Sequence, residues 1–114
     1  MRGDAQLPTS VIAFLRSHVD HLVKLELLLV LHGAPSGTTS VPIVARELDV
    51  PKRQVRDMAN ELVEEDLVRV SSDRIELAPR SIDDRLAIAD LATWYVRDRE
   101  VIVDVLKALG RFAN

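Results

Sequence analysis

The hydrophobic positions between residues 8 and 32 predict two helices at the start of the chain. A short helix is expected to open at Pro8, where apolar residues begin to recur at helical spacing. A second helix is expected to run from Asp20, a suitable N-cap, to Leu31. Its last five residues, from Leu27 on, are apolar on every side. A helix without a polar face is typical of the interior, so we expect this helix at the centre of the fold.

Two amphipathic helices are expected between residues 40 and 66. Residues 33–39 (GAPSGTT) predict a loop, and Ser40 is a suitable N-cap for a short helix that ends at Leu48. After a turn at 49–51, a longer helix is expected to continue to about Asp66, with apolar residues at i, i+3, i+4 and i+7. Its opposite face is polar and carries Arg53, Arg56, Asp57, Asn60 and Glu64.

A hairpin is expected directly after this helix. Residues 67–70 and 74–77 alternate between apolar and polar types on either side of a Ser-Ser-Asp turn. The alternation places Val68, Val70, Ile75 and Leu77 on one buried face. Because two strands alone are only marginally stable, the hairpin must pack on the helices.

The remaining segment, residues 81–110, has helical periodicity. Ser81 and Asp84 have the spacing of a capping box, and no Gly or Pro occurs again until Gly110. One long helix over 81–109 fits this pattern. Two helices separated near residues 97–100 fit it as well.

Composition narrows the classes of function. The 114 residues fit a single domain over 1–114, mainly α with a small β-hairpin, and the formal charge is −3. A protein that coats nucleic acid indiscriminately would be basic throughout. The absence of Cys excludes disulfides, thiolate metal sites and cysteine nucleophiles. We find no signal-peptide pattern and no apolar run of about 20 residues, so a cytoplasmic protein without a membrane segment is expected.

Residues 40–79, SVPIVARELDVPKRQVRDMANELVEEDLVRVSSDRIELAP, resemble a known fold. VAREL (44–48) is similar to the first helix of a helix-turn-helix motif, and LVEEDLV (62–68) is similar to the run that leads into a wing. The chain thus resembles winged helix-turn-helix transcription regulators of bacteria. The resemblance implies that helix 51–66 reads DNA with the help of the wing 67–78. Two positions depart from the pattern: Pro51 replaces a capping Ser or Thr, and Asp66 replaces a common Gly.

The resemblance also implies which residues would contact double-stranded DNA. In such domains the N-terminal half of the second motif helix enters the major groove. Arg can bond guanine, Asn and Gln can bond adenine, and Lys can hold a phosphate. The expected contacts are Lys52, Arg53, Gln54, Arg56 and Asn60 on the helix, with Ser72 and Arg74 in the wing.

A winged helix that binds protein, for example an adaptor, is the alternative function. Residues 49–80 carry six basic and eight acidic side chains, so this segment has a net charge of −2. Release of counterions from DNA would therefore contribute little affinity. Three basic residues nevertheless occupy the first half of the helix, and four of the acidic residues occupy its far end, which would point away from a DNA groove.

The C-terminal segment has more apolar surface than one packed stripe needs. A stripe of about 100° is enough to pack a helix on a small domain. One stripe here contains Leu91 and Leu106, and another contains Ile82, Leu86, Ala89, Thr93 and Val96. We therefore expect a homodimer with two-fold symmetry, unless the first helices cover the surplus. The expected dimer contacts are Leu91, Tyr95, Ile102, Leu106 and Leu109.

No pattern of catalytic or metal-binding residues is present. His18, Asp20 and His21 are close in sequence, but no further ligands follow at a suitable spacing. The chain lacks G-x-S-x-G and a Gly-rich phosphate loop. The sequence therefore predicts neither an enzyme nor a cofactor site.

Overall fold

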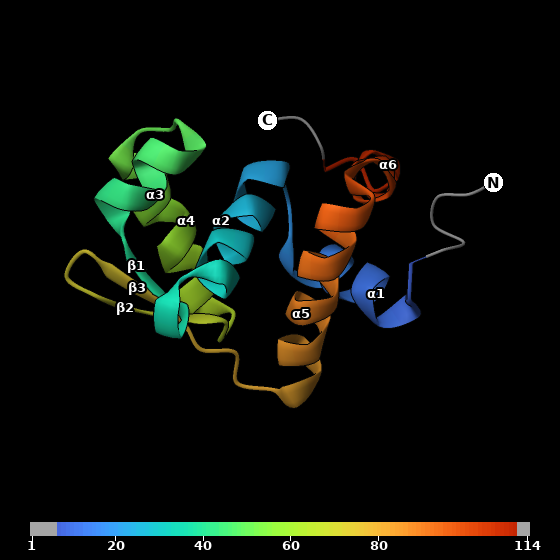
Figure 1. The fold of residues 1–114 in the computed structure, drawn as a ribbon, viewed down its shortest axis with the longest axis horizontal. Helices are drawn as coiled ribbons and strands as arrows, with labels where there is room; N and C mark the ends of the chain where they lie inside the picture. Colours follow the sequence, from blue (N-terminus) through green and yellow to red (C-terminus); the bar gives the residue numbers. More distant parts are fainter. Residues whose placement is uncertain (1–6, 112–114) are drawn as a thin grey trace.

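The computed structural model describes residues 7–111 and is mainly helical, with one small antiparallel sheet (Figure 1). Helix α2 (Leu22–Gly33) follows the shorter α1 (Thr9–His18), as expected. Leu25, Leu27 and Leu28 of α2 are fully buried, and the helix lies between α3–α4 and α5. The N-cap differs from the expectation, because His21 accepts the backbone N–H of Lys24 at 3.4 Å in place of Asp20.

The segment 33–39 is not the simple loop that its composition predicts. It contains a 3-10 turn, η2 (Pro35–Gly37), and leads into a strand, β1 (Thr38–Ser40). β1 pairs antiparallel with β3, with Thr39 opposite Ile75. Thr38–Ser40 has no apolar alternation, so its extended form comes from hydrogen bonds to a strand far along the chain.

Helices α3 (Val41–Leu48) and α4 (Lys52–Glu64) pack against each other through their apolar faces. Asp49 takes a left-handed conformation between them (φ 57°), and the N–H of Val50 closes the turn on the carbonyl of Ala45 at 3.0 Å. Helix α4 ends at Glu64, two residues earlier than expected. Asp66 then adopts φ 62°, which a Gly would adopt without strain.

Strands β2 (Val68–Ser71) and β3 (Arg74–Leu77) form the predicted hairpin and complete a sheet of order β1-β3-β2. Ser72 turns the hairpin with φ 56°. Val68 and Ile75 are buried and Leu77 is half-buried, as the alternation requires. Val70 is exposed, so the buried face of the hairpin is narrower than expected.

The C-terminal segment forms two helices, α5 (Ile82–Arg97) and α6 (Arg99–Ala108), and not one long helix. The side chain of Ser81 caps α5 by accepting the N–H of Asp84 at 2.9 Å. Asp98 leaves helical geometry (φ −155°, ψ 79°), and the chain bends there. The bend turns α6 back toward the core, where Ile102 and Leu106 are fully buried; a straight helix would carry them away from it.

Buried residues from α1 to α6 and from the sheet form one cluster. Within residues 7–111, no helix has both the length and the apolar character needed to cross a membrane.

Candidate nucleic-acid interface

The exposed face of α4 is held in place by its apolar face. Val55, Met58 and Leu62 are buried, as the spacing of the apolar residues predicts. The opposite face presents Lys52, Arg53, Arg56 and Asn60 to solvent, whereas Gln54 is only half-exposed. Four of the five residues expected to read DNA on this helix are therefore accessible.

The turn of the hairpin lies beside the middle of α4. Asp73 accepts a hydrogen bond from Arg56 at 3.4 Å through its carboxylate, and its carbonyl accepts the N–H of Val41 at 2.8 Å. Ser72 and Arg74 flank Asp73 and are exposed. The structure thus joins the expected wing contacts to the exposed face of α4 in one surface.

The N-terminal end of α4 keeps its positive charge available. Among the residues that the structure describes, Lys52 and Arg53 have no ion pair. The pair of Arg56 with Asp73 is about half exposed on both sides, so water and salt screen it. The first N–H groups of the 13-residue α4 add a partial positive charge at the same end.

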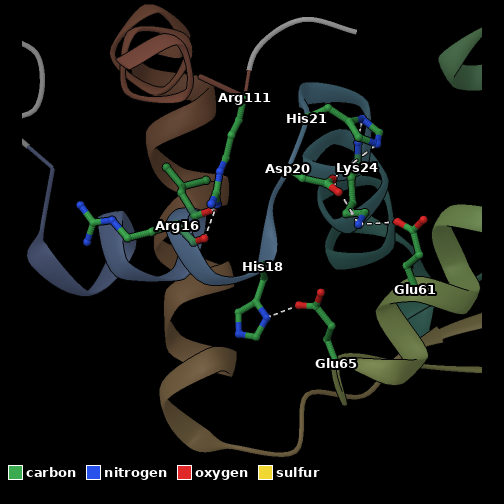
Figure 2. A network of polar contacts seen from close by, with 9 residues as sticks. Arg16, His18, Asp20, His21, Lys24, Glu61, Glu65 and Arg111 are labelled. Atoms are coloured by element: carbon green, nitrogen blue, oxygen red, sulfur yellow. Dashed lines mark hydrogen bonds and ion pairs between the residues drawn. The ribbon is translucent and has the colours of Figure 1, made fainter. Parts of the chain in front are cut away.

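The C-terminal end of α4 has a different electrostatic environment. Glu61 contacts the Lys24 ammonium at 2.6 Å, and Asp20 contacts the same group at 3.2 Å (Figure 2). Only 3% of the Lys24 side chain is exposed. Burial by itself lowers the pKa of Lys24, but hydrogen bonds to Glu61 and Asp20 outweigh it and hold the pKa above its ordinary value.

Two further acidic residues near this end, Glu65 and Asp66, also have partners within the chain. His18 contacts Glu65 through Nδ1 (Figure 2). Its Nε2 lies 3.7 Å from Asp84. Arg80 pairs with Asp66 at 3.3 Å. Glu61, Glu65 and Asp66 thus have partners within the protein near the C-terminal end of α4, whereas Asp57 is exposed on the same face as Arg53 and Arg56, and Asp73 contacts Arg56.

Sequence reasoning did not identify this set of contacts. Its one visible signal is Lys24, a lone cation within the apolar run of the second helix. The position of its partner Glu61, 37 residues later, depends on how α4 packs against α2.

The residues expected at a dimer interface lie in a different place. Leu91, Ile102 and Leu106 are fully buried within the single chain, which corrects their assignment to contacts with a second copy. The bend at Asp98 and the packing of α5 on α1 and α2 account for this burial. Leu109 is half-buried.

Tyr95 is held by polar contacts within its own chain. It donates to Glu26 at 2.7 Å and accepts from Arg99 Nε at 2.9 Å. The pKa of Tyr95 is raised above its ordinary value, mainly because the side chain is partly buried. The hydrogen bond from Arg99 lowers the pKa, and the hydrogen bond to Glu26 raises it. Tyr95 thus links α5 to α2.

The second apolar stripe of the C-terminal segment is exposed instead. Ile82, Leu86 and Val96 of α5 are 72%, 58% and 88% exposed, respectively. Ala89 and Thr93 lie between them on the same side of the helix.

Within the described part of the chain, no group of three or more His, Cys, Asp or Glu side chains could hold a metal ion. Comparison of the chain with protein-family models, with curated proteins and with solved structures gives no match. Function is therefore inferred from the residues themselves.

Proposed function

We propose that this protein is a winged helix-turn-helix regulator that binds double-stranded DNA. The order α2, β1, α3, α4, β2, β3 supports this fold, because a winged helix places a helix-turn-helix before a hairpin and pairs a short early strand with it. Helix α4 is the recognition helix and β2–β3 is the wing. A cytoplasmic location is part of this proposal, as expected for regulators of the bacterial kind that the chain resembles.

The observation that carries the proposal is the separation of charge along α4. Lys52 and Arg53 have no ion pair among residues 7–111, and they extend from the end of the helix that would enter a groove. Glu61 at the far end is neutralised by buried Lys24. The end of α4 that would enter the DNA major groove therefore carries cationic side chains and free backbone N–H groups.

Each residue has a defined role in this interface. Arg53 and Arg56 read base edges in the major groove, with Asn60 further along the same face. Lys52 holds a phosphate, which positions the helix without specifying a sequence. Ser72 and Arg74 contact the backbone or the minor groove from the wing.

The proposal is tested by selecting bound fragments from a randomised double-stranded DNA library and measuring affinity for the enriched site. Arg53→Ala and Arg56→Ala are each expected to weaken binding by about 1–3 kcal/mol and to relax the preference at one base pair. Arg16→Ala is the matched control, because Arg16 is exposed on α1, at the other end of the molecule (Figure 1). A library from which no sequence is enriched, together with no retention of DNA at low salt, would refute the proposal.

A protein-binding adaptor is the second candidate, and the pairing of Arg56 with Asp73 favours it. This pair lowers the free positive charge in the middle of the exposed face, where Asp57 is also exposed. An adaptor would retain one protein partner after nuclease treatment, and Arg53→Ala would leave its low-salt DNA retention unchanged.

A further inference from the structure

The exposed stripe of α5 lies opposite the side of this helix that faces the core. At 100° per residue, Ile82, Leu86, Ala89, Thr93 and Val96 fall within a sector of about 80°, and buried Leu91 lies on the far side. Three large apolar side chains in line along a 16-residue helix are unusual for a surface that only water covers.

The stripe has a similar spacing on the two sides of Ala89. Ile82 and Val96 are each seven residues from Ala89, while Leu86 and Thr93 are three and four residues away. A two-fold axis beside Ala89 would therefore set Ile82 against Val96 of a second copy, and the small Ala89 would let the two helices approach closely. Self-complementarity of this kind is what a two-fold interface requires.

Charge along one flank of the stripe favours an antiparallel pair. Asp83, Asp90 and Arg97 lie on this flank, and none of them has an ion pair among the residues that the structure describes. Asp83 and Asp90 line a groove of about 590 Å³ between α1 and α5. None of the described residues that line this groove is Lys or Arg.

In an antiparallel pair the same flanks of the two helices meet, so Arg97 of one copy lies over Asp83 of the other, at the edge of the acidic groove, while Asp90 of each copy lies beside the axis and faces solvent next to its counterpart. A parallel pair would instead bring this flank against the one that carries Arg85. Arg85 already donates to the carbonyl of Pro79 at 3.5 Å.

The geometry points to a homodimer in which the α5 helices of two copies pack antiparallel, crossing at Ala89. Helix α2 separates α5 from α4 and the sheet, so the pairing leaves the candidate DNA surface of both copies free (Figure 1). Two such surfaces related by a two-fold axis suit a site with two half-sites. The dimer does not depend on DNA binding, and it is tested without DNA.

Disulfide trapping tests the arrangement directly, because the natural chain has no Cys. Ile82 and Val96 are 14 residues apart, about 21 Å along a helix, whereas a disulfide joins Cα atoms about 4.4–6.8 Å apart. Under mild oxidation, a mixture of Ile82→Cys and Val96→Cys proteins is expected to form a covalent dimer, and neither protein alone is expected to do so. Ala89→Cys alone is expected to crosslink.

Asp104→Cys is the matched control, since Asp104 is exposed on α6 outside the stripe; mixed with Ile82→Cys, it should give only background crosslinking. Crosslinking of Ile82→Cys with itself as efficiently as in the mixture would overturn the antiparallel arrangement. A monomeric mass of the unmodified protein by light scattering, with no crosslinking at Ala89→Cys, would overturn the dimer itself.

Charge reversal gives a second measurement. Asp83→Arg and Arg97→Asp are each expected to raise the dissociation constant of the dimer about tenfold, and the double variant is expected to restore it to within about threefold. Circular dichroism verifies that each variant remains folded. Additive losses in the double variant would show that these side chains do not meet and would overturn the charge pairing on which the arrangement rests.

Discussion

The charged residues at the two ends of α4 differ in whether they have partners within the protein. At the N-terminal end, Lys52 and Arg53 are exposed and have no ion pair among the described residues. At the C-terminal end, Glu61 contacts a lysine that is almost completely buried, and Glu65 contacts His18. One end thus has charge available for a partner outside the molecule, while the other uses its charge to hold α4 on α2 and α1. Net charge alone does not reveal this division.

The largest expected effect is on stability, when the contacts at the C-terminal end of α4 are removed. Lys24→Ala is expected to lower the free energy of unfolding by about 2–4 kcal/mol, because the buried stem of the lysine is lost and two carboxylates lose their partner. Lys24→Met keeps most of the buried volume. Its cost is expected to stay within about 1 kcal/mol, since Asp20 and Glu61 are more than half exposed and can turn to water.

Urea denaturation measures both variants. Equal losses for Lys24→Ala and Lys24→Met would mean that charge, and not packing, holds this end. Neither variant is expected to change the DNA affinity of the folded protein by more than about twofold, because Lys24 lies outside the exposed face of α4.

A smaller effect, on DNA affinity, is expected when the surface around the N-terminal end of α4 is made more basic. Asp73→Asn removes the carboxylate that contacts Arg56, and is expected to tighten DNA binding by about 0.2–1 kcal/mol, the range of an exposed ion pair. The salt dependence of binding should steepen by up to about one unit, because Arg56 becomes free to replace a counterion.

Fluorescence anisotropy titrations at several salt concentrations measure this change. Glu64→Gln is the matched control, since it also removes one exposed carboxylate from the motif but at the far end of α4. If both variants tighten binding equally, overall charge and not the contact with Arg56 is responsible.

The smallest expected effect concerns alkaline pH. The pKa of Lys24 is raised in the folded protein, so the folded state keeps a proton that the unfolded state loses. The stabilisation is complete below the ordinary lysine pKa of 10.5 and is lost as pH rises through the higher folded value. Unfolding free energies measured between pH 9 and 11.5 should decline more steeply for the natural protein than for Lys24→Met. Parallel curves would contradict a raised pKa.

Tyr95 adds to this decline, because its pKa is also raised and its neutral form is the one that donates to Glu26. Tyr95→Phe separates its contribution from that of Lys24.

Much of the candidate site follows from local patterns. The apolar spacing of α4 set which face is buried, so the exposure of Arg53, Arg56 and Asn60 was predictable. The alternation around Ser72 predicted the hairpin. The strand β1 was not predictable in this way, because Thr38–Ser40 is polar and becomes a strand only by pairing with β3.

The C-terminal segment shows where a local pattern leaves the outcome open. Its sequence has two apolar stripes, and the spacing of the apolar residues alone does not show which stripe is buried in the core. The bend at Asp98 and the packing of α5 against α1 and α2 buried Leu91 and left Ile82, Leu86 and Val96 outside.

The sequence by itself determined the helices α1 to α4, the hairpin and the basic character of the N-terminal end of α4. These features depend on residues within a few positions of one another, and the geometry of a helix or a turn relates such residues directly. Only the tertiary structure decided that Lys24 neutralises Glu61, that Asp73 lies against Arg56, and which stripe of α5 stays exposed. The two ion pairs join residues that are 37 and 17 positions apart, and their distances depend on how whole elements pack.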